Sequence, residues 1–503
     1  MKENTNKAIA VNSVILYIRL VIVSVCGLLY TRFSLQALGT NDYGIYSVVA
    51  CIITFATMIN TVMIVTSNRY MAMAIGKGNI NECRKTFNIN LIIHIGIAIL
   101  TIVIALPIGH LYITNYINYD GNLSNVYCVF YISIIASALS FVGVPYNGLL
   151  LAKEKFVVFC STDVFASIIK LIFTYLLIEH FQHKLIIYAL IMAFMTSFPT
   201  IIFWGYCKRY FPTITHFIFV KDRKRYWEVI KFSISIAYGA FALIAQSQGS
   251  ALLINIFFNT AMNAGLAVAT SVSNILQTFA NNAQKSISPQ VVKSYANNNI
   301  SRSMRLVCFS SKLTFCSMLF VSMPFLLIPE TIYGLWLKQI PPYAINFTRL
   351  LIINLLIMSI NAGLSDFVFA TGRIKAYQII TNTLIISSVI VGYFSLKCGM
   401  PSEHLFYIYI GFSIIVSAIR PIIIKYISTF NIRALAIESY IPAVAISILS
   451  LVLWPLKLLL NQWVLIIISY LYLSLLIYLI GLKKDDRNKF LSIIKSKFTK
   501  REH

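Results

Sequence analysis

Residues 12–33, NSVILYIRLVIVSVCGLLYTRF, form an apolar run long enough to cross a lipid bilayer as a helix. Arg19 lies well inside this run. A charge at bilayer depth is costly, so it normally faces the interior of a helix bundle or a water-filled cavity. A long basic side chain also has the option of reaching the interface. Asn12, seven residues earlier on the same helical face, favours a polar stripe, and we therefore expect Arg19 to face a cavity.

Similar runs recur along the whole chain, which has 503 residues, 58% of them hydrophobic and 11% charged. The composition predicts an all-α polytopic membrane protein. The first run is too long for the apolar core of a signal peptide and lacks a small-residue cleavage site, so we expect it to remain as the first span. The nine cysteines and seven histidines lack the paired spacings of metal or redox sites. We therefore expect no metal and no other bound cofactor.

Hydropathy predicts about fourteen spans. They lie near residues 12–35, 43–66, 87–110, 123–150, 156–180, 185–207, 232–256, 262–288, 306–328, 344–370, 376–396, 404–426, 439–457 and 462–482.

The net charge of +25 follows the topology of these spans. With the amino terminus in the cytoplasm, 31 of the 41 lysines and arginines fall in inner segments and five in outer connections. This asymmetry agrees with the positive-inside rule and predicts that both termini are cytoplasmic. Because the basic charge is an orientation signal, which anionic lipids of the inner leaflet reinforce, we expect a bilayer partner and no nucleic acid.

The span at 262–288, MNAGLAVATSVSNILQTFANNAQKSIS, is the least apolar of the set. A simple hydropathy window rejects it, which would put the carboxyl-terminal tail, with its eight basic residues, outside the cell. The charge distribution therefore argues that this polar helix crosses the membrane and faces protein or water.

An internal repeat supports a doubled bundle. A shift of 221 residues aligns 42–50 with 263–271 and 67–84 with 288–305 without a gap. It places the first two spans on the seventh and eighth, which predicts two pseudo-symmetric six-helix bundles with a substrate site at their interface. The predicted parts are an amino-terminal lobe (1–207), a basic cytoplasmic linker (208–231), a carboxyl-terminal lobe (232–426), two further helices (427–482) and a basic cytoplasmic tail (483–503).

The fifth span carries Asp163 and Lys170 near its middle, seven residues apart and so on one face. At about 10 Å along the axis they are too distant for an ideal direct salt bridge, although an ion pair bridged by neighbours fits the spacing. Lys170 is close to the helix midpoint, and we expect it to be the principal cavity cation. Asp163, and Asp366 in the tenth span, are candidates for buried ion pairs or for coupling to a proton or sodium gradient.

Polar side chains form a stripe on the eighth span at steps of three and four residues: Ser271, Asn274, Thr278, Asn281, Lys285 and Ser288. Gln277 and Gln284 flank this stripe, and Gln246 and Gln248 lie on the seventh span. Amides and hydroxyls both donate and accept hydrogen bonds, as sugar hydroxyls require. Helix packing through small and polar residues is the alternative explanation. The length of the stripe favours a lined cavity.

Three segments near the amino terminus carry a family resemblance: NSVILYIRL (12–20), LYTRFSLQALGTNDYGIYSVV (29–49) and SNRYMAMAIGKGN (67–79). They resemble the opening of bacterial Wzx-type O-antigen and polysaccharide flippases, of the multidrug/oligosaccharidyl-lipid/polysaccharide (MOP) exporter superfamily. The resemblance implies two six-helix, MATE-like lobes around a central cavity, with alternating access. It also implies transport of an undecaprenyl-diphosphate-linked oligosaccharide, an O-antigen or capsule repeat unit, between leaflets of the bacterial inner membrane, and a polysaccharide polymerase as a partner.

The residues agree with such a substrate, because a diphosphate-linked glycan would lose its water in hydrocarbon and needs compensating groups. We expect cavity cations to bind the diphosphate and amides to bind the sugars. The candidates for binding the substrate are Arg19, Lys170, Gln246, Gln248, Asn274, Gln277, Asn281 and Lys285.

Two other functions are alternatives. A multidrug or cation antiporter on the same scaffold would favour buried carboxylates, whereas the first span here carries an arginine and no acid. A membrane glycosyltransferase or polysaccharide polymerase requires a sizeable outer loop with catalytic acids, and the outer connections here are short and poor in acids. We therefore expect a transporter and not an enzyme.

Overall fold

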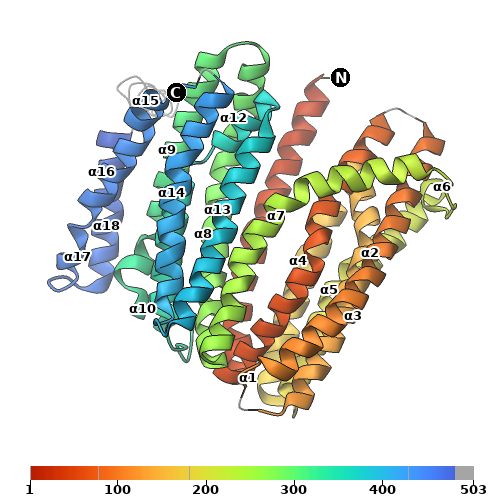
Figure 1. Cartoon of the computed structure of the whole chain (residues 1–503), viewed down its shortest axis with the longest axis horizontal. Helices are drawn as coiled ribbons and strands as arrows, with labels where there is room; N and C mark the ends of the chain where they lie inside the picture. The colour runs from red at the N-terminus through yellow and green to blue at the C-terminus, as the bar shows by residue number, and fades with distance from the viewer. Residues whose placement is uncertain are drawn as a thin grey trace, which may run out of the picture. The chain divides into compact units, whose positions relative to one another are not determined.

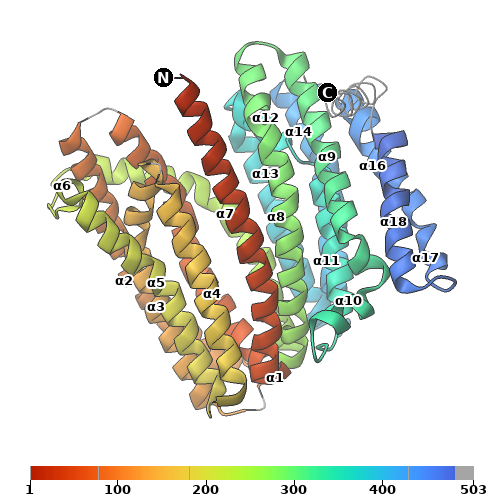
Figure 2. The same cartoon turned by 180° about the vertical axis from the view of Figure 1, so that it is seen from behind.

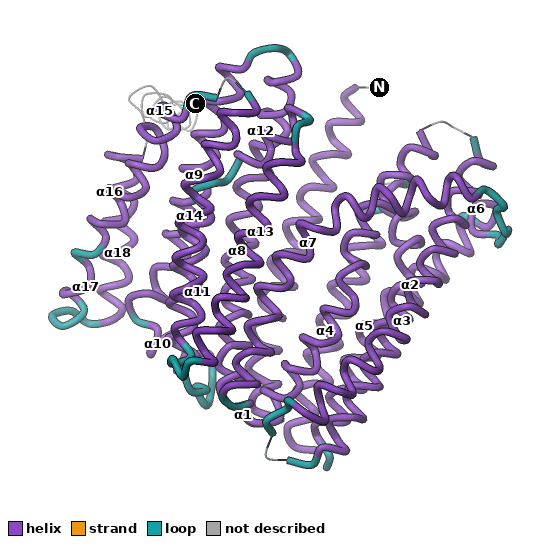
Figure 3. Tube along the Cα trace, viewed as in Figure 1, coloured by secondary structure: helices purple, strands orange, loops and turns teal. Residues whose placement is uncertain are grey.

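The computed structural model describes residues 2–76, 79–119, 121–153, 155–180, 182–428 and 430–481, and every regular element in these ranges is a helix (Figure 3). Eleven helices in the described ranges are long and apolar enough to cross a membrane, or twelve if the bent pair α11 (Ala344–Ser359) and α12 (Leu364–Thr371) is one span. The chain is thus a multi-pass membrane protein. The predicted tail 483–503 lies outside the described residues.

The predicted count of fourteen spans is not confirmed, and two helices account for the difference. Helix α1 (Lys2–Gly76) runs through both of the first two predicted spans. Helix α8 (Thr260–Ala296) covers the predicted polar span but does not meet the hydropathy criterion for a membrane span. Length alone therefore permits α8 to cross, whereas its many amides and hydroxyls keep its mean hydropathy low.

Gly39 divides α1. Its backbone has φ 73° and ψ 178°, and the helix is broken there. Positive φ is readily available only to glycine, because any Cβ would crowd the backbone. The break is confined to this one residue, and Thr40 to Asp42 already belong to the second half of the helix.

Contacts divide the chain into two compact units. Unit 1 consists of Met1–Ser271, Trp336–Ala344 and Ile386–Leu405. Besides α1 and the start of α8, its elements include α2 (Ile80–Asn115), α3 (Leu123–Ala152), α4 (Phe156–His180), α5 (Lys184–Tyr210), α6 (Pro212–Thr215) and α7 (Arg223–Phe257) (Figures 1 and 2).

Within unit 1, α3 packs on α5, and α1 packs on α3, α4 and α7. A core of branched aliphatic and aromatic side chains joins α1 to α3, including Ile45, Val48, Phe130 and Ile134. Gly44 permits the close approach of two backbones, because a Cβ at this position would collide with the carbonyl oxygen of Thr260. These contacts hold the second half of α1 against α3 and the start of α8.

Unit 2 consists of Val272–Leu335, Ile345–Ile385 and Phe406–His503. Apart from α8, α11 and α12, its elements include α9 (Ile300–Leu327), α10 (Pro329–Trp336), α13 (Ile374–Lys397), α14 (Glu403–Ile427), α15 (Ile432–Leu435), η1 (Ala436–Tyr440), α16 (Ile441–Ser450), α17 (Leu453–Leu456), α18 (Gln462–Leu476) and η2 (Ile477–Gly481). Helix α13 contributes residues to both units, as α8 does.

The two additional helices predicted at 427–482 pack inside unit 2. Phe315 and Leu319 of α9 share a buried cluster with Ala443 of α16 and with Leu465 and Leu473 of α18. The predicted lobes, linker and pseudo-symmetry remain predictions, because these contacts do not test a repeat.

Candidate functional site

An ion pair joins α1 and α4. Arg19 donates from Nε to Oδ2 of Asp163 at 2.9 Å, and its Nη2 group binds the same oxygen. The guanidinium also lies 4.9 Å from the centre of the Phe159 ring, which is one turn before Asp163 on α4. The two charged side chains are 29% and 24% exposed. A carboxylate therefore offsets much of the charge of Arg19 in this arrangement.

Lys170, seven residues further along α4, contacts an aromatic ring instead of a carboxylate. Its Nζ lies 3.6 Å from the centre of the Tyr30 ring on α1, a cation–π contact. Within the described ranges Lys170 forms no ion pair. Arg19 and Tyr30 lie about three turns apart on one face of α1. Arg19 and Lys170 thus form a cation row along the contact between α1 and α4.

Tyrosine side chains cluster at the end of this row. The rings of Tyr30 and Tyr188 on α5 stack with centres 6.1 Å apart, and Tyr46 meets Tyr188 edge-on at 4.7 Å. The hydroxyl of Tyr188 donates to Oγ of Ser34 at 3.1 Å. The hydroxyl of Tyr30 contacts that of Tyr188 and donates to Sδ of Met192 at 3.1 Å. These bonds fix the ring that Lys170 contacts.

The same tyrosines line a pocket of about 260 Å³ in unit 1, here named the tyrosine pocket. It lies among α1, α5, α7 and the first turns of α8. Its aromatic lining consists of Tyr30, Tyr43, Tyr46 and Tyr188, and its polar lining includes Ser47, Ser247, Gln248, Thr270 and Ser271. Among the described residues that line it, none carries a formal charge. Tyr30 therefore connects this neutral pocket to the cation row, because it lines the pocket and also contacts Lys170.

These tyrosines are not among the site residues predicted from the sequence. Aromatic residues near the ends of spans are normally explained by the membrane interface, which hides any other role. The available signal was the spacing of Tyr30 from Arg19, which places both on one face of α1. Nothing in the sequence indicated that Tyr188, from another helix, would stack on Tyr30.

The amides predicted to bind substrate have different surroundings. Gln248 lines the tyrosine pocket, whereas Gln246 donates from Nε2 to Oγ of Ser388 on α13 at 3.1 Å. The α8 residues Asn274, Gln277 and Asn281 belong to unit 2 and are exposed. The side chain of Lys285 lies outside the described part of the chain.

Asp366, the second candidate for ion coupling, accepts a hydrogen bond from Nε2 of Gln284 at 3.0 Å. Both residues belong to unit 2. Asp163 and Asp366 thus each have a partner, Arg19 in the first case and an amide in the second.

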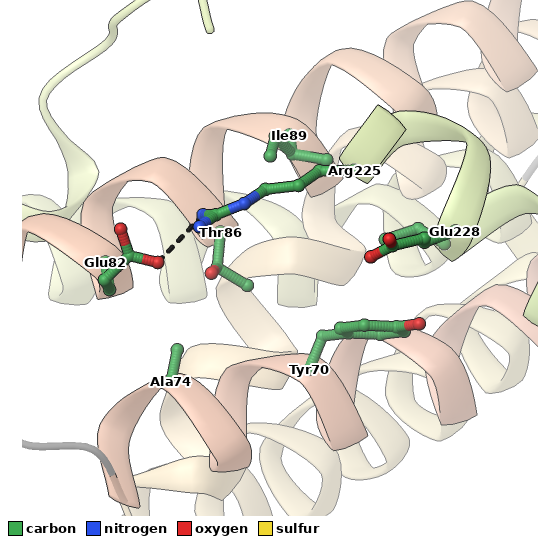
Figure 4. Close-up of a pocket in the computed structure, with 8 residues that line it drawn as sticks. Tyr70, Ala74, Glu82, Thr86, Ile89, Arg225 and Glu228 are labelled. Carbon is green, nitrogen blue, oxygen red and sulfur yellow. Dashed lines mark hydrogen bonds and ion pairs between the residues drawn. The ribbon is translucent and has the colours of Figure 1, made fainter. Parts of the chain in front are cut away.

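A second pocket of unit 1, of about 270 Å³, lies where α7 begins (Figure 4). The first turns of α7 run across the ends of neighbouring helices in unit 1 (Figure 1). Arg225 donates from Nη1 to Oε2 of Glu82 on α2 at 2.8 Å, and Asp222 caps the helix by accepting from the backbone N–H of Arg225 at 3.2 Å. Glu228 also lines the pocket and is exposed. The ion pair fastens α7 to α2, and the Asp222 cap marks the beginning of α7 within the stretch 208–231 that is predicted as a basic linker.

Comparisons with known proteins identify the class of fold. No protein-family model matches the chain, and no curated protein matches it. Solved structures do match. The inward-facing structure of a multidrug resistance MATE family transporter of the MOP superfamily has a TM-score of 0.64 and 12% identity, and the match covers 82% of this chain and 98% of that one.

The lipid II flippase MurJ in an inward closed conformation has a TM-score of 0.60 and 13% identity, with 93% of this chain and 99% of that chain covered. A MOP superfamily transporter from Pyrococcus furiosus, described by the reverse polarity of its binding pocket, has a TM-score of 0.53 and 11% identity over 83% and 96% of the two chains. The protein therefore has the fold of MOP superfamily transporters, a fold found both in multidrug transporters and in a lipid flippase.

Proposed function

We propose that the protein is a flippase that moves an undecaprenyl-diphosphate-linked oligosaccharide, an O-antigen or capsule repeat unit, from the cytoplasmic to the periplasmic leaflet of a bacterial inner membrane. Transport proceeds by alternating access. The polyprenyl chain stays in the lipid while the diphosphate and the sugars pass along the protein. No covalent step is needed, and a polysaccharide polymerase is the partner that would use the product.

The observation that carries this proposal is Lys170, a cation near the middle of a membrane helix with no carboxylate paired to it among the described residues. An uncompensated charge at that depth is expensive, so it indicates a functional role. An anionic diphosphate would supply the missing counter-charge through charge-assisted hydrogen bonds. The cation–π contact holds the ammonium in place until the substrate arrives.

Arg19 has a different role in this proposal. Its guanidinium has five donors, and the contact with Asp163 engages two of its nitrogens. A phosphate oxygen would bind the remaining donors, or displace Asp163 and release its carboxylate to take up a proton or a sodium ion. This exchange would couple transport to a proton or sodium gradient through Asp163. Asp366 is the second candidate for such coupling.

A multidrug antiporter is the second candidate, because the MATE structure is similar over 98% of its length. The charge of the site argues against it. A cationic drug would meet Arg19 and Lys170, with Asp163 already occupied by Arg19. The Pyrococcus furiosus structure, whose reversed pocket polarity suggests a different function for that protein, illustrates that this fold accepts pockets of either sign.

The test uses a bacterial strain that lacks the gene and carries variants of the full chain at equal abundance. Lys170→Ala and Arg19→Ala should each remove surface polysaccharide and leave lipid-linked oligosaccharide on the cytoplasmic leaflet, since the diphosphate loses its counter-charge. Lys397→Ala, at the exposed end of α13, is the matched control and should export normally. Full export by the double variant Arg19→Ala/Lys170→Ala would refute the mechanism. Uptake of a fluorescent cation into vesicles would support the antiporter instead.

A further inference from the structure

We propose that the tyrosine pocket is a binding site for a neutral sugar ring, the one next to the diphosphate of the transported lipid. The proposal rests on the proposed function for the identity of the substrate. It adds a second site, on different residues, to the cation row. It also separates the two amides predicted on α7: Gln248 binds the sugar and Gln246 does not.

The lining of the pocket has the chemistry that sugars require. A sugar ring has apolar C–H faces, which pack on aromatic rings, and hydroxyl groups at its edge, which need both donors and acceptors. Tyr43, Tyr46 and Tyr188 supply aromatic rings to the lining of the pocket. Gln248 and Ser47 supply an amide and a hydroxyl. A purely apolar ligand would leave these polar groups without partners, which is unfavourable.

Gln248 is the decisive side chain. It lines the pocket, it is only partly exposed, and no hydrogen bond to another described residue engages its carboxamide. Gln246, two residues earlier on α7, already donates to Ser388. Two glutamines on one helix therefore differ in one respect: the first is engaged within the protein, and the second is available to a ligand.

Charge and size restrict the ligand further. No charged side chain lines the pocket among the described residues, so it suits neither a phosphate nor a cationic drug. Its volume of about 260 Å³ is just below the range of about 300 to 1,000 Å³ that holds drug-sized ligands. The pocket therefore fits a single compact ring and not a long glycan.

The position of the pocket also agrees with a sugar bonded directly to a diphosphate. Tyr30 lines the pocket, and Lys170 lies 3.6 Å from the centre of the same ring. A ligand that places its anionic group at Lys170 would bring the group next to it to Tyr30. In a diphosphate-linked glycan that neighbouring group is the first sugar.

The experiment measures saturation-transfer NMR signals from a panel of neutral monosaccharides and N-acetylhexosamines, and separately the binding of inorganic pyrophosphate, with the full chain in detergent. At least one sugar should bind. Gln248→Leu should weaken it about five-fold or more, as the loss of a ligand hydrogen bond predicts. Gln246→Leu is the matched control and should bind the sugar like the wild type. Lys170→Ala should lose pyrophosphate and keep the sugar.

Each result decides the proposal. Absence of saturation transfer from every sugar, or equal weakening by Gln246→Leu and Gln248→Leu at unchanged thermal stability, would overturn the sugar site. The proposed function fails by a different result, namely full export by the variant that lacks both Arg19 and Lys170. If export is normal in that variant but sugar binding depends on Gln248, the sugar site stands and the proposed function fails. If the pocket binds no sugar but Lys170→Ala abolishes export, the proposed function stands and the sugar site fails.

Discussion

At the scale of single residues, the site depends on how two cations in membrane helices are compensated. Arg19 has a carboxylate and an aromatic ring, whereas Lys170 has an aromatic ring alone. An ion pair in low-dielectric surroundings is costly to break by removing one partner, because the other charge is left unpaired. Removal of the Asp163 carboxylate should therefore leave Arg19 unpaired, whereas Lys170 has no paired carboxylate to lose among the described residues.

We expect Asp163→Asn to lower the thermal stability of the protein, because it leaves Arg19 without its counter-charge. Arg19→Gln should also destabilise, and the double variant should be more stable than the sum of the two effects predicts. A coupling energy of about 1 kcal/mol or more is expected for a contact of this kind. Thermal unfolding in detergent measures it. Additive effects of the two substitutions would show that the ion pair contributes nothing.

At the scale of elements, the break at Gly39 divides α1 into two halves that contribute different residues to the candidate site. The break at Gly39 lets its first half carry Arg19 and Tyr30 and its second half carry Tyr43 and Tyr46. Both halves thereby reach the tyrosine pocket. A continuous helix would direct the second set elsewhere.

Gly39→Ala should therefore destabilise the protein by about 1 to 2 kcal/mol, the cost of forcing a side chain into positive φ. Gly27→Ala is the control on the same helix, since a Cβ there meets no atom within 4 Å and the backbone is not in positive φ. That variant should be neutral or slightly stabilising, because alanine favours helices. Equal melting temperatures for the two variants would contradict the role assigned to Gly39.

The start of α7 depends on one ion pair with α2. Glu82→Gln should loosen this attachment, since the charge-assisted bond from Arg225 becomes a weaker neutral one. Hydrogen exchange of the backbone amides over residues 223–229 should become faster in that variant. Glu228→Gln is the matched control: Glu228 lines the same pocket (Figure 4) and forms no ion pair with the described residues. Equal exchange in both variants would show that the ion pair does not hold α7.

At the scale of the whole molecule, ion pairs join segments that are distant in the sequence. Glu330 on α10 accepts from Nζ of Lys457 at 3.2 Å and pairs with Arg349 at 3.4 Å, all within unit 2. Partial burial opposes ionisation of Glu330, but hydrogen bonds from its backbone and from Lys457, with the charges of Lys457 and Arg349, outweigh it and lower its pKa.

A lowered carboxyl pKa stabilises the folded protein above the ordinary glutamate pKa of about 4.3. This contribution is lost as the pH falls through the lower folded value. The wild type should therefore melt at a higher temperature than Glu330→Gln at neutral pH, and the difference should shrink as the pH falls below about 4.3 and vanish below the lowered folded pKa. A difference that persists in acid would contradict the assignment.

The predicted features differ in how far the structure supports them. The membrane class and the helical composition are confirmed, because apolar length and charge distribution are properties of local sequence. The predicted number of spans is not confirmed. Hydropathy is least informative for α1, which is broken at a single residue, and for α8, which is rich in amides. Arg19, Lys170 and Gln248 occur together around α1 in unit 1, whereas Gln246 turns to Ser388.

The sequence alone determined that this chain crosses a membrane many times and that it carries cations where cations are costly, because hydrophobicity and charge act residue by residue. Only the tertiary structure decided which neighbour compensates each cation. The Arg19–Asp163 pair, the Lys170–Tyr30 contact and the stacking of Tyr30 on Tyr188 each join helices more than 130 residues apart in the chain. Contacts of that kind depend on how helices pack, and no periodicity within one helix encodes them.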